Sequence, residues 1–171
     1  MTRAPSEREP ARIAWEEVRD EFRFDGAWID LYAFEVGPVQ WDRMFRALEG
    51  VGYRLLLGES KAAVVVDFSE MQRVRERTGS AIVDLMIADE ILLQAFLYDP
   101  ERIEITVDPR KVSNADAYAR LCSVVELIGA AVGRTVTLCP ENGHWLPFLS
   151  YSPSEDVWTR LQPDFSVTPV Y

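Results

Sequence analysis

The stretch from Glu90 to Gly133 constrains the fold most, because two strand patterns are followed there by one long helix pattern. Residues 91–98 form a nearly unbroken apolar run, and Asp99-Pro100 after them is a turn signal. In residues 101–108, isoleucine and valine alternate with polar residues, which is the period of a strand buried on one face. We therefore expect two antiparallel strands joined by a tight turn.

A long helix is expected directly after these strands. Ser113, with Asp116 three residues later, is close to a capping box, and Gly133 suits the C-terminal cap. Between these ends, apolar residues recur at the three- and four-residue spacing of one helix face. This stripe consists of Tyr118, Leu121, Val125, Ile128 and Val132.

The remaining sequence repeats the alternation of strand and helix patterns. Residues 27–57 run strand, helix and strand, and so do residues 101–139, which predicts two β-α-β-like units. The first unit has the helical stripe Trp41, Met44, Phe45 and Leu48. Further predicted elements are helices at 11–21 and 68–77, strands at 62–66 and 81–88, an edge strand at 145–151, and a helical turn with Val157, Trp158 and Leu161.

These patterns predict a fold of the α+β class. We expect a mixed or mostly antiparallel sheet with helices packed on one face. A chain of 171 residues suits one domain, residues 1–171, in which residues 1–10 are expected to be frayed and residues 163–171 to form an irregular tail.

The net charge of the chain limits the kinds of partner that we expect it to bind. A net charge of −10, from 28 acidic and 18 basic residues, disfavours nucleic acid and anionic membranes, which are polyanions. The residues Met1 to Pro10 lack the apolar stretch of a signal peptide, and no run of 18 apolar residues is present. We expect no membrane span and a cytoplasmic location.

Motifs for catalysis and metal binding are absent from the sequence. The only histidine is His144, and it lies in a polar, turn-like segment. HExxH, CxxC, Walker A and GxSxG patterns are missing, so we expect no metal, no cofactor and no catalytic residues. The two cysteines, Cys122 and Cys139, are expected to be buried apolar residues.

Carboxylates are concentrated between Asp84 and Asp108, where Arg102 is the only basic residue. Clustered on strands and turns, they predict an acidic rim that attracts a basic partner protein. The simpler alternative is that turns and exposed strand faces are polar in any soluble protein. The predicted partner-binding residues are Asp84, Asp89, Glu90, Asp99, Glu101, Glu104 and Asp108.

Residues Arg102–Tyr151 carry a resemblance to a known kind of protein. They contain IEITVDPRKV, SNADAYARLCSVVELIGAAVGR, TVTLCPENG and PFLSY. This part, under a third of the chain, resembles small acidic α+β proteins of bacteria, among them immunity proteins of polymorphic or contact-dependent toxin systems. The resemblance implies a protein that binds and blocks a cognate toxin without catalysing a reaction.

The sequence is thus consistent with three functions. The leading hypothesis is a non-catalytic, immunity-type inhibitor that covers a basic toxin with an acidic surface. The second is a small-molecule-binding protein or enzyme, with a pocket between sheet and helices around His144, Glu141 and Tyr151. The third is a homodimer formed by pairing of sheet edges, with no ligand.

Overall fold

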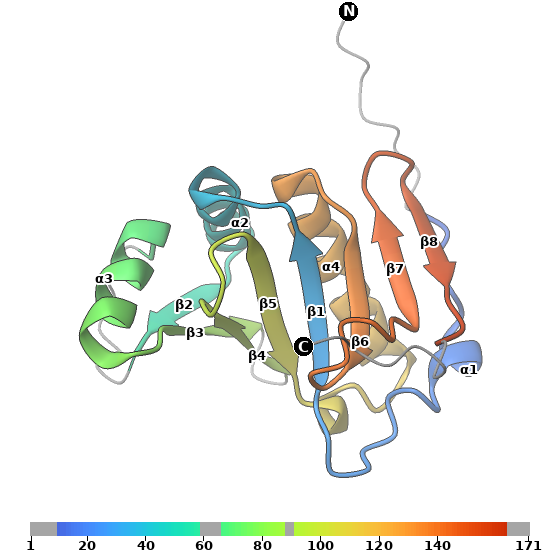
Figure 1. Cartoon of the computed structure of the whole chain (residues 1–171). Coiled ribbons are helices and arrows are strands. Elements are labelled where there is room, and N and C mark those ends of the chain that lie inside the picture. Colours follow the sequence, from blue (N-terminus) through green and yellow to red (C-terminus); the bar gives the residue numbers. More distant parts are fainter. Residues whose placement is uncertain (1–9, 59–65, 88–90, 164–171) are drawn as a thin grey trace, which may run out of the picture.

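The computed structural model describes residues 10–58, 66–87 and 91–163. Within them, eight strands form one sheet in the order β2-β3-β4-β5-β1-β6-β7-β8, and all neighbouring strands are antiparallel (Figure 1). The predicted α+β class is confirmed. The strands are β1 (Ile29–Phe34), β2 (Arg54–Leu57), β3 (Ile82–Ile87), β4 (Ile91–Phe96), β5 (Arg102–Val107), β6 (Val136–Pro140), β7 (Leu149–Ser152) and β8 (Val157–Arg160).

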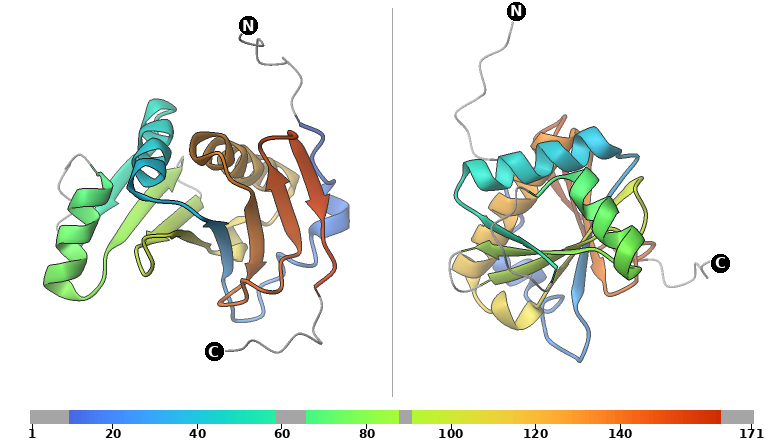
Figure 2. Two further views of the ribbon diagram at one scale, coloured as in Figure 1. Left: turned by 45° about the horizontal axis from the view of Figure 1, so that its top comes forward. Right: turned by 90° about the vertical axis from the view of Figure 1, so that its left-hand side faces the viewer.

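The helices leave one face of the central strands open. Two long helices, α2 and α4, pack against each other on the other face of the sheet, and α3 packs against α2 (Figure 2). No helix in the described part of the chain covers the opposite face of β4, β5 and β1. The helices are α1 (Trp15–Val18), α2 (Pro38–Gly50), α3 (Phe68–Thr78) and α4 (Ala115–Val132), with a short 3-10 helix, η2, at Pro109–Lys111.

Alternation along the strands gives the sheet two different faces. Leu31 and Ala33 of β1 and Ile105 of β5 belong to the apolar core beneath the helices. Between them, Asp30 and Tyr32 point to the open face, because successive residues of a strand face opposite sides. The sheet thus separates an apolar core from a polar surface.

Both predicted helix stripes lie in the core. Each large apolar side chain that is fully buried stabilises the fold by about 1.5–3 kcal/mol. In α2 the buried residues are Trp41, Met44, Phe45 and Leu48. In α4 they include Tyr118, Leu121, Val125, Ile128 and Val132.

The two predicted β-α-β units are present, but in each unit other strands of the sheet lie between its two strands. Both β5 and β6 are antiparallel to β1, which lies between them, so α4 connects two strands that run in the same direction. In the other unit, β5, β4 and β3 lie between β1 and β2. The strands β4, β5, β1 and β6, with α2 and α4, have the order of a ferredoxin-like split β-α-β arrangement, in which β2, α3 and β3 are inserted between α2 and β4. This places β1 at the centre of the sheet.

The end of the described chain differs from the sequence prediction. The predicted edge strand corresponds to β7, which pairs with both β6 and β8 and is therefore not at an edge. The predicted helical turn at Val157, Trp158 and Leu161 is wrong, because Val157–Arg160 forms strand β8. Asp156 turns the chain with a φ of 57°, and the ring of Trp158 then packs on Tyr151 with centroids 5.3 Å apart. The strands β2 and β8 end the sheet, and a homodimer through them stays a prediction.

The beginning of the described chain is also less helical than predicted for residues 11–21. Only Trp15–Val18 is helical in this range, and Arg12 before it contacts α4. Arg12 holds this segment in place with hydrogen bonds of 2.7 and 2.6 Å to the two carboxylate oxygens of Glu126. Of the predicted strand at 62–66, residues 62–65 lie outside the described residues, as do 1–9 and 164–171 of the predicted frayed end and tail.

The N-terminal cap of α4 is Asn114 rather than the predicted Ser113. The Asn114 side-chain oxygen accepts a hydrogen bond of 2.9 Å from the backbone N–H of Ala117, whereas Ser113 is exposed. We expect Asn114→Ala to lower the free energy of unfolding by about 1 kcal/mol, because one N–H of the first turn loses its acceptor. The control Ser113→Ala is expected to change it by less than about 0.5 kcal/mol. Urea denaturation of both variants measures this, and equal losses contradict the assignment.

Candidate functional site

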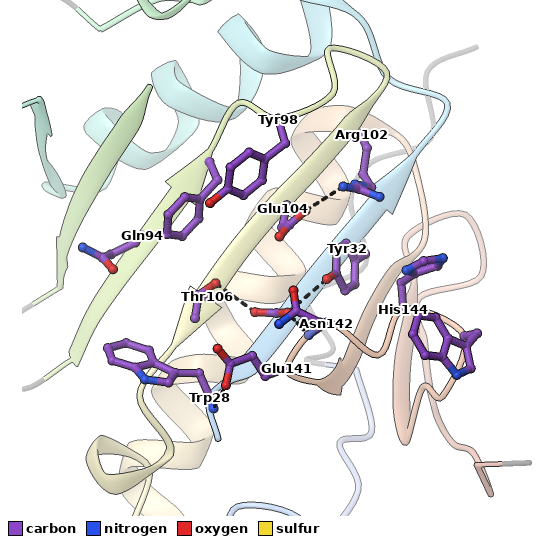
Figure 3. A pocket seen from close by; sticks show the side chains of 13 residues that line it. Trp28, Tyr32, Gln94, Tyr98, Arg102, Glu104, Thr106, Glu141, Asn142 and His144 are labelled. Atoms are coloured by element: carbon purple, nitrogen blue, oxygen red, sulfur yellow. Dashed lines mark hydrogen bonds and ion pairs between the residues drawn. The ribbon is translucent and has the colours of Figure 1, made fainter. Parts of the chain in front are cut away.

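A pocket of about 560 Å³ lies on the open face of the sheet, away from α2 and α4 (Figure 3). Its floor comes from β4, β5 and β1, and one wall comes from the loop that follows β6. The size is within the range of about 300–1,000 Å³ that is usual for ligand pockets. The lining residues are Trp28, Asp30, Tyr32, Gln94, Phe96, Tyr98, Arg102, Glu104, Thr106, Glu141, Asn142, His144 and Trp145.

Strand register arranges the floor in two rows across the sheet. One row consists of Gln94, Thr106 and Asp30, which are directly opposite one another on β4, β5 and β1. The next row consists of Phe96, Glu104 and Tyr32 on the same strands. Side chains in one row are neighbours, since adjacent strands are about 4.8 Å apart. The floor therefore has a polar row beside a row in which a carboxylate lies between two aromatic rings.

The carboxylate of Asp30 is the centre of a hydrogen-bond network, although only 2% of the residue is exposed. It accepts bonds from the hydroxyl of Thr106 at 2.8 Å, the hydroxyl of Tyr32 at 3.0 Å and the backbone N–H of Asn142 at 2.7 Å. Three donors compensate for the loss of water that burial imposes on a charged group. The network links β1 to β5 and attaches the pocket wall to the floor.

A second set of hydrogen bonds holds the loop after β6 against the start of β1. The backbone N–H of Trp28 donates to the Glu141 carboxylate at 3.0 Å, and the Glu141 N–H donates to the Trp28 carbonyl at 3.0 Å. Asn142 adopts a φ of 57°, which turns the chain so that its N–H reaches Asp30. The wall is thus built by the backbone of this loop, which positions Glu141 and His144 over the floor.

Glu104 is 8% exposed and forms an ion pair of 2.9 Å with Arg102, two residues before it on the same strand face. Burial raises the pKa of the Glu104 carboxyl, and the nearby Asp30 adds to this increase, while Arg102 opposes it. The Arg102 guanidinium also lies over the ring of Tyr32, 5.5 Å from its centroid. Arg102 therefore compensates the charge of Glu104 only in part.

Aromatic rings surround these charges on both sides. On β4, Phe96 stacks with Tyr98 at a centroid distance of 5.3 Å. On the other side, the ring of His144 is 5.8 Å from Tyr32 and 4.9 Å from Trp145. Burial, together with the charge of Arg102, lowers the pKa of His144, so this imidazole is neutral at neutral pH. Burial and the nearby carboxylates raise the pKa of Tyr32, which therefore stays a protonated donor.

The structure distributes the predicted acidic residues over several places. Asp84 and Glu104 are on the open face, where Asp84 accepts a hydrogen bond of 2.9 Å from Gln94. Asp99 and Glu101 are exposed in the β4–β5 turn. Asp108 lies at the other end of β5 in an ion pair of 2.8 Å with Arg110, whose hydrogen bonds lower the pKa of this carboxyl. These described residues do not form one continuous rim.

The two remaining predicted residues, Asp89 and Glu90, lie outside the described residues. That the residues of the predicted acidic set bind a partner protein stays a prediction. Among the described members of the set, only Glu104 lines the pocket.

The pocket predicted around His144, Glu141 and Tyr151 corresponds in part to the structure. Glu141 and His144 line the pocket, but it lies on the open face of the sheet rather than between sheet and helices. Tyr151 is on the helix side, where its ring packs at a tilt against that of Trp158 and is 3.0 Å from the position that a Cβ on Gly129 of α4 would take. Tyr151 therefore belongs to the core.

Sequence reasoning did not select Asp30, Thr106 or Asn142 as site residues. A usable signal was present for Asp30, because it is the only charged residue in the otherwise apolar and aromatic segment 27–34. A charge in a central strand requires partners. The partners themselves are 76 and 112 positions away, which local sequence patterns do not reveal.

The described part of the chain contains neither a metal site nor a membrane-spanning helix. No group of three or more His, Cys, Asp or Glu side chains there is arranged to hold a metal ion. None of the helices described there is long and apolar enough to cross a membrane. Cys122 and Cys139 are buried, as predicted, and burial raises the pKa of each thiol to about 12.

Comparisons of the chain with protein-family models, with curated proteins and with solved structures gave no match. The function must therefore be inferred from the residues of the site.

We expect Asp30→Ala to lower the free energy of unfolding by about 2–4 kcal/mol. The substitution removes the acceptor of all three donors, and the backbone N–H of Asn142, unlike the hydroxyls of Tyr32 and Thr106, is not able to rotate toward another acceptor. Urea denaturation measures the loss. The exposed control Asp20→Ala is expected to change stability by less than about 0.5 kcal/mol. A similar small effect at Asp30 contradicts its role as the centre of the network.

The raised pKa of Glu104 predicts a pH dependence of stability. In the unfolded chain its pKa is about 4.3, so between that value and the raised one the folded protein binds more protons than the unfolded chain. Unfolding should therefore become easier as the pH rises through this window. We expect the free energy of unfolding of the wild type to fall relative to that of Glu104→Gln as the pH rises from about 4.3 through the raised pKa of Glu104. Urea titrations at several pH values test this, and a wild type that becomes more stable relative to the variant over this range contradicts it.

Proposed function

We propose that this chain is a non-catalytic binding protein that neutralises a basic partner protein, in the manner of a toxin-immunity protein. The observation that carries the proposal is the charge of the pocket. Among the residues that the structure describes, three carboxylates line it, those of Asp30, Glu104 and Glu141, against the single guanidinium of Arg102. Such an excess of negative charge attracts cationic groups and repels phosphate or nucleic acid.

The aromatic side chains around the pocket support a protein partner. Phe34 is 40% exposed and Tyr98 is 52% exposed, and the rings of both pack on residues that line the pocket. Phenylalanine and tyrosine are enriched in protein interfaces, where a few of them supply most of the binding energy. Exposed rings beside buried charges suit an interface with an apolar centre.

The total charge of the chain supports the same partner. With a net charge of −10, long-range attraction speeds the encounter with a basic protein. The segment that resembles immunity proteins, Arg102–Tyr151, also supplies much of the pocket, including Arg102, Glu104 and His144. The resemblance and the pocket therefore concern the same part of the molecule.

A small-molecule ligand is the second candidate function. It is favoured by the volume of about 560 Å³ and by the side-chain amides and hydroxyls that converge on the pocket from Gln94, Thr106 and Asn142. A protein partner accounts better for the exposed rings at its margin. The two functions differ in the size of the partner and in the salt dependence of binding.

The test is to produce this chain in cells together with the product of the adjacent gene, since toxin and immunity genes are commonly neighbours. We expect the chain to protect these cells and to bind the purified product, with an association rate constant that falls as salt increases because charges are screened. Glu104→Gln should protect less well than the control Glu49→Gln, an exposed substitution on α2. Absence of both binding and protection contradicts the proposal.

A further inference from the structure

The floor of the pocket has a feature that identifies the chemistry of its ligand more closely. Glu104 on β5 lies directly between Phe96 on β4 and Tyr32 on β1. Its carboxylate thus has an aromatic ring on each side, at the spacing of neighbouring strands. An aromatic face attracts cations through its quadrupole, and a carboxylate attracts them through its charge.

The chain itself shows which cation fits this environment. The guanidinium of Arg102 is 2.9 Å from Glu104 and lies over the ring of Tyr32 at 5.5 Å. This pairing uses one side of the carboxylate and one of the two rings. On the other side, Phe96 and Tyr98 form a stacked pair whose planes differ by 8°, and no basic side chain from the described residues lines that half of the pocket.

Negative charge exceeds positive charge among the described residues of the pocket, so a second cation would be attracted to it. Glu104 lies on the floor and Glu141 on the wall, and Arg102 is the only cationic side chain that lines the pocket within the described chain. The pKa of Glu104 is raised by burial in spite of Arg102, which means that its negative charge is incompletely compensated. A cation from a partner would complete this compensation.

We propose that the pocket receives the side chain of an arginine from the partner protein, with the guanidinium paired to Glu104 and stacked against Phe96 and Tyr98. This inference deepens the proposed function and rests on it. Arginine suits the site better than lysine, because its guanidinium is flat, is less strongly hydrated and stacks on aromatic rings. A flat cation also fits beside the nearly parallel rings of Phe96 and Tyr98.

The inference is tested with two small probes, N-acetyl-arginine amide and N-acetyl-citrulline amide. Citrulline has nearly the same shape as arginine but no charge, so the pair isolates the contribution of the cation. Chemical-shift titrations of the intact chain by NMR measure the affinity and identify the residues that respond. We expect saturable binding of the arginine probe, with shifts at the pocket, and at least tenfold weaker binding of the citrulline probe.

Three variants test the direction of the charge effect. Glu104→Gln keeps the shape of the side chain and should weaken binding of the arginine probe at least tenfold. Arg102→Gln removes the internal cation and should strengthen binding, whereas a pocket for an anion would lose affinity. The matched control Glu49→Gln, exposed on the helix side, should leave the affinity unchanged.

The outcomes separate this inference from the proposed function. Equal binding of both probes, absence of saturable binding, or weaker binding by Arg102→Gln overturns the arginine site. If the chain still neutralises the product of the adjacent gene in that case, the proposed function stands and the contact lies elsewhere. If the arginine probe binds as expected but no protein is neutralised, the chemistry of the pocket stands and the immunity function falls. Because the citrulline comparison uses the unmodified chain, it remains decisive even if a variant does not fold.

Discussion

The structure of the open face depends on the burial of one carboxylate, that of Asp30, in the central strand of the sheet. A charged group at this depth is stable only with several donors, and these come from Tyr32 on the same strand, from Thr106 on β5 and from the backbone of Asn142. The last bond matters most for the site, because it attaches the loop after β6 to the sheet. A pocket wall is thus a consequence of compensating a buried charge.

This constraint explains why the two faces of the sheet differ so strongly. The face beneath α2 and α4 is made of aliphatic side chains such as Leu31 and Ile105, whose packing supplies most of the stability. The opposite face carries polar and aromatic groups on the same strands, which contribute less to the core and are costly to bury. Polar residues are usual on a face of an antiparallel sheet that no helix covers. What is unusual on this face is the burial of the two carboxylates of Asp30 and Glu104, and this burial is what distinguishes the pocket.

The sequence was sufficient to predict most of the helices and strands, but only a part of the site, namely Glu104, Glu141 and His144. The stripes of α2 and α4 and the strands 91–98 and 101–108 were predictable, because a regular period encodes each of them locally. The strand β8 was missed because Trp158 is buried by a cross-strand contact with Tyr151, which short-range spacing does not encode. The acidic rim was predicted from residues that are close in sequence, and spacing along the chain does not reveal their neighbours in space. Strand register places Glu104 opposite Tyr32, and Asp108 forms an ion pair with Arg110.

The two buried carboxylates of the pocket differ in how completely they are compensated, and this difference separates structure from function. Asp30 has three hydrogen-bond donors and holds the loop, so a ligand gains little by approaching it. Glu104 has one cation at 2.9 Å, and burial still raises its pKa. A charge that the fold leaves incompletely compensated costs stability in the unbound protein, and an arriving cation recovers that cost as binding energy. Of the two carboxylates, Glu104 is thus the one to which we assign the contact with the proposed basic partner.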